Sequence, residues 1–304
     1  MKTRLATIWL ALVFAFTAAA KNTFQRVEVI REVDSGEGPL LDFIAHYTYE
    51  RGNLVRVVRE SDLDLDGTND FRSVVTYTYD GRGNRIVAAS ETTSTLDPRR
   101  DSRSTVTYEY DGQGQIVGTL LKADSDVDGT VDFISRVTLT YNDRGNLVRR
   151  VIESDRDADG TWDNSTTFSR TYDARDNLLM EVRESDGDAD GTVDFIITTN
   201  YTLDDGGDAV LVVTEIDYEA DGIVDGTARR ISTYDKQGNV LSAVTESYDP
   251  DGVLEATSRV DYSYVYDVHR NITRTTVAHD FEADGIVDWT EITSYKYARV
   301  KDSR

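Results

Sequence analysis

The chain has 304 residues, no cysteine, and 56 Asp and Glu residues against 33 Lys and Arg, which gives a net charge of −23. So large a negative charge repels nucleic-acid phosphates and anionic membrane surfaces, and neither is expected as a partner. Without cysteine the fold cannot use disulfides. The 17 Tyr and 9 Phe, with only 3 Pro, favour ordered β-strands over disorder.

Residues 1–20 have the composition of a secretory signal peptide. A basic start, Met1–Arg4, precedes an apolar run that ends in three alanines before Lys21. The run is short for a stable membrane anchor, and no later segment predicts a membrane-spanning helix. We therefore expect cleavage near Ala20 and a protein that is secreted, on the cell surface or periplasmic.

The rest of the chain is a repeat. Its register is marked by one position, occupied by tyrosine in all copies but one, that recurs at steps of 30 to 32 residues: Tyr49, Tyr79, Tyr110, Tyr141, Tyr172, Leu203, Tyr234, Tyr266 and Tyr297. A fixed period of this kind indicates stacked copies of one supersecondary unit. No change in composition interrupts the pattern, so residues 21–304 are predicted to form a single domain of about nine 31-residue repeats.

One repeat, followed from Tyr141, contains four elements in order. A turn over 142–145 leads into a β-rich run over 146–153, an acidic loop over 155–163 and a second β-rich run over 165–172. In better-kept copies the second run alternates with period two, as a half-buried strand does, with one face formed by Phe71, Ser73, Val75, Tyr77 and Tyr79. Each repeat is therefore predicted to be a β-hairpin. The fold class is all-β, an antiparallel meander of about 16 to 18 strands that curls, winds into a spiral or closes.

The turn half of the repeat carries the motif Tyr-Asp-x-x-Gly-Asn. It occurs over residues 79–84 and 234–239, and with one substitution over 110–115. This motif resembles the YD (Rhs-type) repeats of bacterial exported proteins, teneurins and toxin shells. The resemblance implies hairpins that wind into a spiral β-sheet. The spacing here is longer than the usual YD unit because the acidic loop is added.

The acidic half of the repeat has the form Asp-x-Asp-x-Asp-Gly-x-x-Asp in its best copies, and Glu replaces the third position in two others. Carboxylates at positions 1, 3, 5 and 9, with Gly at position 6 for a sharp turn, suit calcium, a hard ion that takes six to eight oxygens. A solvated acidic turn would explain one such loop, but not the same spacing in six. The candidate ligands are Asp62, Asp64, Asp66 and Asp70; Asp124, Asp126, Asp128 and Asp132; Asp155, Asp157, Asp159 and Asp163; Asp186, Asp188, Asp190 and Asp194; Asp217, Glu219, Asp221 and Asp225; and Asp280, Glu282, Asp284 and Asp288.

These loops are not EF-hands, because strands flank them and the bidentate Glu of an EF-hand is missing at position 12 in five of the six. They resemble the strand-bounded calcium loops of integrin-type FG-GAP repeats. Three further copies, over 34–42, 93–101 and 247–255, have lost part of the pattern. We expect weak binding or none there, with partial binding in the last, which keeps Asp249, Asp251 and Gly252.

No constellation of catalytic residues stands out from the repeat, and His46, His269 and His279 are scattered, so an enzyme is not expected. The favoured function is a secreted structural or adhesive protein whose calcium ions, about six, stiffen the loops between hairpins. Two alternatives stay open: a module that binds an extracellular glycan or protein, and a YD-type shell component of an exported toxin system. A stripe in register could serve the binding alternative, although it more often forms a core ladder: Tyr47, Tyr77, Tyr108, Leu139, Tyr201, Tyr264 and Tyr295.

Overall fold

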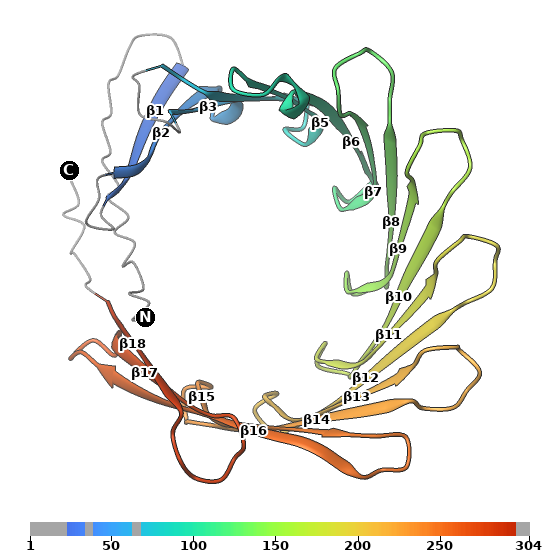
Figure 1. The fold of residues 1–304 in the computed structure, drawn as a ribbon, viewed down its shortest axis with the longest axis vertical. Coiled ribbons are helices and arrows are strands. Elements are labelled where there is room, and N and C mark those ends of the chain that lie inside the picture. Colours follow the sequence, from blue (N-terminus) through green and yellow to red (C-terminus); the bar gives the residue numbers. More distant parts are fainter. Residues whose placement is uncertain (1–22, 34–38, 63–67, 296–304) are drawn as a thin grey trace. The chain divides into compact units, whose positions relative to one another are not determined.

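The computed structural model describes residues 23–33, 39–62 and 68–295 (Figure 1). The regular secondary structure of these residues is β-strand, apart from a 3-10 turn at Pro98–Arg100, so the predicted all-β hairpin array is confirmed. The strands are β1 (Thr23–Val33), β2 (Pro39–Glu50), β3 (Asn53–Asp62), β4 (Phe71–Tyr79), β5 (Arg85–Ser94), β6 (Ser102–Tyr110), β7 (Ile116–Asp124), β8 (Phe133–Tyr141), β9 (Leu147–Asp155), β10 (Asn164–Tyr172), β11 (Leu178–Asp186), β12 (Phe195–Leu203), β13 (Ala209–Asp217), β14 (Gly226–Tyr234), β15 (Val240–Tyr248), β16 (Leu254–Tyr266), β17 (Ile272–Asp280) and β18 (Trp289–Ser294).

The contacts divide the chain into two units, and each is described by itself. Unit 1 comprises residues 1–140 and 151–165, and unit 2 comprises 141–150 and 166–304. In unit 1, β1 to β8 pair consecutively and antiparallel. In unit 2, β11 to β18 do the same. Each unit therefore contains a meander, and the single domain expected over residues 21–304 stays a prediction.

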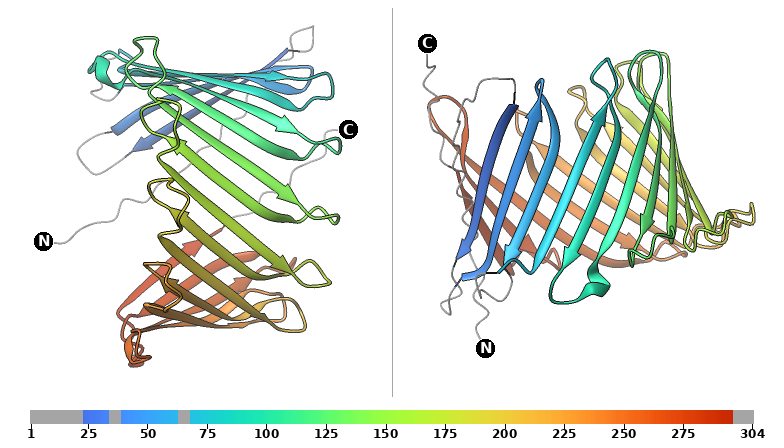
Figure 2. Two further views of the ribbon diagram at one scale, coloured as in Figure 1. Left: turned by 90° about the vertical axis from the view of Figure 1, so that its right-hand side faces the viewer. Right: turned by 90° about the horizontal axis from the view of Figure 1, so that it is seen from above.

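Successive connections lie at opposite ends of the strands, as a meander requires (Figure 2). Tight turns join each Tyr-ending strand to the next strand, and acidic loops join the hairpins. The period-two alternation that the sequence predicts is clearest in β6 and in the second half of β8. Along β6, half-buried and exposed residues follow one another at every position from Ser102 to Tyr110.

The tight turns explain the Asp-x-x-Gly-Asn motif. Asp80 Oδ1 accepts the backbone N–H groups of Arg82 (2.9 Å) and Asn84 (2.8 Å), while Asn84 Nδ2 donates to Asp80 Oδ2 (3.0 Å). Gly83 has φ of +88°, a conformation that favours glycine. An Asp or Asn side chain makes the equivalent turn bonds at Asp111, Asn142, Asp173, Asp204, Asp235 and Asp267.

These bonds predict an acid-dependent loss of stability that can be followed at Asp235. The Asn239 side chain, together with backbone N–H groups, lowers the pKa of the Asp235 carboxyl from 3.8 to about 2. Because the folded pKa is depressed, this contribution to stability is full above about pH 4 and is lost as pH falls through about 2. A carboxyl-carbon NMR titration should give a midpoint for Asp235 well below 3.8, and a midpoint at or above 3.8 would contradict the prediction.

The motif tyrosine ties each repeat to the preceding one. The hydroxyl of Tyr79 donates to the carbonyl of Leu54 at 2.6 Å, just after the previous tight turn. The same bond recurs from Tyr110 to Arg85, Tyr172 to Leu147 and Tyr234 to Ala209, at 2.7 to 2.9 Å. The 25-residue separation of every pair shows that the bond belongs to the repeat.

Removing one of these hydroxyls should destabilise the sheet. Tyr234→Phe is expected to lower the free energy of unfolding by about 1 kcal/mol, because the part-buried Ala209 carbonyl loses its donor. Tyr218→Phe is the matched control, since Tyr218 is 61% exposed. Urea denaturation of both variants measures the difference, and equal effects would argue against the bond.

Burial is shallow across the strands. Among the residues whose exposure is described (45–62, 68–97 and 99–295), the buried apolar side chains are Ala45, Val57, Val58 and Ala243. Ion pairs such as Arg103–Glu91 (3.0 Å) cross neighbouring strands, but exposed pairs contribute little. Each sheet therefore depends heavily on its backbone ladders, turns and loops.

Candidate metal centres

The acidic loops share one backbone framework. The N–H of the position-9 aspartate donates to the carbonyl of the residue preceding position 1, as from Asp132 to Ala123 at 2.8 Å. The carboxylate of position 9 then accepts the N–H of position 2, as Asp132 does from Ser125 at 2.6 Å. The first bond occurs in all six predicted loops. The second recurs in the loops that begin at Asp155, Asp186, Asp217 and Asp280.

The position-1 aspartate lies inside the loop. Asp155 is 2% exposed, and its two carboxylate oxygens accept N–H groups from Asp159 (3.2 Å) and Gly160 (3.0 Å). Gly160 has φ of +97°, which explains the glycine at position 6. The carboxylate is thus oriented by the backbone before any cation arrives.

In the loops that begin at Asp124 and Asp186, one oxygen of this aspartate has no hydrogen-bond donor among the described residues. Gly129 and Gly191 donate to Oδ2 of Asp124 (3.1 Å) and Asp186 (2.9 Å). The Oδ1 atoms of Asp124 and Asp186 are buried without a hydrogen-bond partner. A buried carboxylate oxygen without a donor is costly unless a cation approaches it.

In two loops the position-5 aspartate accepts hydrogen bonds from the side chain and the backbone of the threonine two residues on. The Thr130 hydroxyl and its backbone N–H lower the pKa of the Asp128 carboxyl, and Thr161 does the same for Asp159. These carboxylates therefore stay ionised well into acid conditions. Asp128 Oδ1 accepts both bonds from Thr130, at 2.7 Å from N and 2.5 Å from Oγ1.

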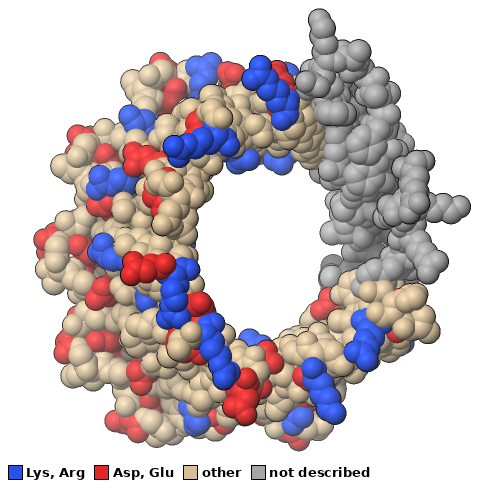
Figure 3. All heavy atoms as spheres, turned by 180° about the vertical axis from the view of Figure 1, so that it is seen from behind, with Lys and Arg blue, Asp and Glu red and all other residues tan. Residues whose placement is uncertain are grey.

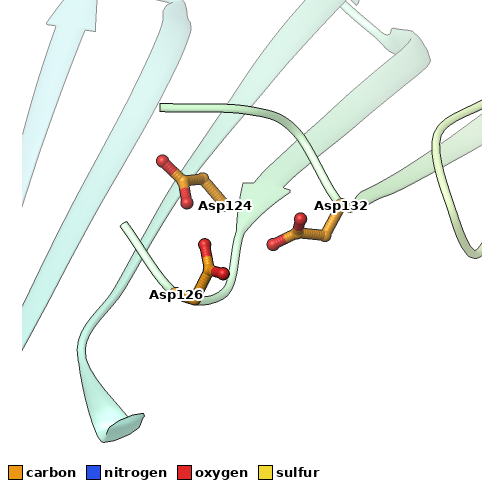
Figure 4. A group of neighbouring side chains, drawn as sticks. All are labelled: Asp124, Asp126 and Asp132. Atoms are coloured by element: carbon orange, nitrogen blue, oxygen red, sulfur yellow. The ribbon is translucent and has the colours of Figure 1, made fainter. Parts of the chain in front are cut away.

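Carboxylates converge in three loops. Oxygens of positions 1, 3 and 9 lie within 4.8 Å of one another in each of them, as Figure 4 shows for the first: Asp124, Asp126 and Asp132; Asp155, Asp157 and Asp163; Asp186, Asp188 and Asp194. Calcium binds oxygens at about 2.3–2.6 Å, so oxygens on opposite sides of one ion lie about 5 Å apart. The three loops fit calcium by donor type and spacing.

The predicted ligands outside these three groups do not converge in the same way among the described residues. Within residues 45–62 and 68–295, the loops that carry Glu219 and Glu282 keep the backbone framework but do not bring three carboxylates this close. The position-5 residues Asp128, Asp159 and Asp190 are outside the converged groups. In the first loop Asp62 and Asp70 are described, whereas Asp64 and Asp66 lie outside the described residues.

The loops with a degraded pattern have other structures. Asp249 Oδ1 accepts the N–H of Val253 (2.7 Å), and Gly252 N donates to the Asp249 carbonyl (3.0 Å), so residues 249–253 form the same tight turn as the Asp-x-x-Gly motif. The sequence signal for this turn is Asp-Pro-Asp-Gly at 249–252, and the tight turn replaces the partial metal loop that the acidic spacing predicts there. Over 93–101, the Pro98–Arg100 turn replaces the sharp glycine turn. Residues 34–38 of the first copy lie outside the described residues.

No protein-family model matches this chain, and no curated protein matches it. Among solved structures, a porin-like protein from Bacteroides uniformis is similar at 14% sequence identity, with a TM-score of 0.36, over 79% of this chain and 96% of that one. Across the described residues, no helix is both long and apolar enough to cross a membrane.

Proposed function

We propose that this protein is an exported, non-catalytic repeat protein that binds calcium in its acidic loops and uses the ions to stiffen the connections between hairpins. The observation that carries the proposal is the convergence of three carboxylates within 4.8 Å in each of three loops. Backbone N–H groups already orient the position-1 and position-9 carboxylates, so little reorganisation opposes binding.

Charge also favours cation binding. Acidic side chains recur over the described part of the face shown in Figure 3, and the whole chain carries 56 of them against 33 basic ones. Such an excess destabilises a compact state by self-repulsion. Calcium bound in the loops would relieve this repulsion where carboxylates lie closest.

A non-catalytic role fits the repeated nature of these groups. The carboxylates recur with the repeat and accept backbone N–H groups within their own loops. An active site, in contrast, needs a set of residues that occurs once and lines a pocket. His279 stacks on Trp289 and Phe281, with ring centroids 4.9 and 6.0 Å apart, which is a structural role. Export is proposed from residues 1–20, which have the composition of a signal peptide.

We propose the YD relationship for the hairpin half of the repeat alone. The motif's Asp, Gly and Asn have roles in the tight turn, and its Tyr joins neighbouring repeats. These bonds support a hairpin array and say nothing about a toxin cargo. We therefore favour the calcium-binding structural role over a role as a shell component of an exported toxin system.

Isothermal titration calorimetry with calcium tests the proposed function. We expect saturable binding at about 10⁻⁴ to 10⁻³ M, with the three converged loops contributing the strongest sites. Magnesium should bind more weakly, because it demands near-ideal octahedral geometry and keeps its waters. Absence of a calcium heat, or equal affinity for magnesium, would overturn the proposal.

A further inference from the structure

A hollow of about 320 Å³ lies on one face of the unit 1 sheet, where β6, β7 and β8 run side by side. Its lining includes Glu109 from β6, Gly118 and Leu120 from β7, Arg136 and Thr138 from β8, and Trp162 from the acidic loop 155–163. Leu120 pairs with Thr107 and Arg136, so these side chains share a face, and Tyr108 lies on the other. The hollow is therefore separate from the tyrosine stripe.

Gly118 creates the depression. It stands in the middle of β7, between Glu109 and Thr138 on the neighbouring strands. A Cβ added there would lie 3.0 Å from Glu109 Oε2, so the carboxylate of Glu109 reaches over the space that a side chain would fill. Glycine weakens a strand, and inside one it often marks a place where another group approaches closely.

Trp162 and Arg136 form one wall. The Arg136 guanidinium lies 4.8 Å from the centre of the Trp162 ring, and it pairs with Glu153 at 2.7 Å. These contacts place the planar guanidinium over one face of the indole and leave the other face of the ring free of Arg136. Glu109, in contrast, forms no ion pair within the described residues.

We propose that this hollow binds a neutral sugar residue of a glycan. The C–H face of a pyranose ring can lie against the indole face of Trp162 that Arg136 leaves uncovered, while its hydroxyls donate to Glu109 and accept from Arg136. One cation, Arg136, faces two carboxylates, Glu109 and Glu153, and this charge disfavours anionic sugars. The hollow is open on the sheet face, which suits a residue within a longer oligosaccharide.

The site goes beyond the proposed calcium function and does not depend on it. Trp162 occupies position 8 of a converged metal loop, so all binding measurements are made in calcium buffer. Metal binding is measured separately, by calorimetry without sugar. Failure of the sugar site and failure of the calcium sites therefore give different results.

The test titrates the full-length exported protein with cellohexaose, mannohexaose and chitohexaose, and with an oligogalacturonate as the anionic comparison. Binding is followed by calorimetry and by intrinsic tryptophan fluorescence. We expect saturable binding of at least one neutral hexasaccharide, weakened about tenfold or more by Trp162→Ala. Trp289→Ala is the matched control, because Trp289 of β18 does not line the hollow, and it should leave affinity unchanged.

Gly118→Val is a second variant that still tests the site if Trp162→Ala fails to fold. Valine suits a strand, and the nearest obstacle is the mobile end of Glu109, so the melting temperature should be unchanged or higher. Sugar binding should nevertheless be lost. No binding to any neutral hexasaccharide, unchanged affinity in both variants, or a preference for oligogalacturonate would overturn the proposal.

Discussion

Chelating calcium is expected to lower the free energy of unfolding of this protein by about 4 kcal/mol. Each of the three converged loops contributes about 1.4 kcal/mol when free calcium is about ten times the dissociation constant. The loss is large compared with the typical net stability of a domain, about 5–15 kcal/mol. Apolar burial cannot compensate, since only four apolar side chains are buried among the residues whose exposure is described.

Calorimetric melts in millimolar calcium and in EGTA measure this effect. A decrease in melting temperature of roughly 10 °C is expected from the size of the chain. Magnesium added to the EGTA sample is the control for general screening, and it should restore little of the loss. Superimposable melts in calcium and EGTA would rule out calcium as a stabilising ligand.

Substitutions at position 1 and at position 3 of one acidic loop should distinguish the stability that comes from hydrogen bonds to the backbone from the stability that comes from bound calcium. Asp155→Ala is expected to cost about 3 kcal/mol in EGTA, because the N–H groups of Asp159 and Gly160 lose their buried acceptor. In calcium the cost should rise by about 1.4 kcal/mol, because Asp155 also belongs to the converged group. This is the largest effect expected from any single loop carboxylate. Urea denaturation in calcium and in EGTA gives both values.

Asp157→Ala should act only when calcium is present. Its carboxylate is exposed and accepts one long bond, at 3.3 Å from Asp159 N, so the backbone needs it little. As a ligand it belongs to the converged group, and its loss should cost about 1.4 kcal/mol in calcium and almost nothing in EGTA. Asp143→Ala, at an exposed tight-turn position, is the matched control and should be neutral in both buffers. Equal effects of Asp157→Ala in the two buffers would argue against a metal at this loop.

Local sequence is sufficient to predict the elements of this fold. The recurring tyrosine, the Asp-x-x-Gly turn and period-two alternation predict strands and connections that the structure confirms. The reason is that the stabilising bonds are local: Asp80 holds residues only two and four positions away. The framework of the acidic loops is equally local, since its bonds join residues within nine positions of each other.

The tertiary structure decided which predicted ligands meet. Six loops share a nearly identical pattern, yet three carboxylates converge in three of them within the described residues. One cause is side-chain length, because Glu219 and Glu282 carry an additional methylene at position 3. The loop at 249–253 shows a second cause, since competing turn chemistry there forms a tight turn in place of a metal loop.

Sequence by itself thus determined the repeat, its hairpins and the spacing of its acidic groups, because each is set by hydrogen bonds between near neighbours in the chain. Only the tertiary structure brought Glu109, Gly118, Arg136 and Trp162 to one hollow. These residues are separated by up to 53 positions, and their meeting depends on the register of three strands and the path of the following loop. A one-residue slip would turn every side chain of the slipped strand to the other face, so spacing in the sequence cannot predict such a site.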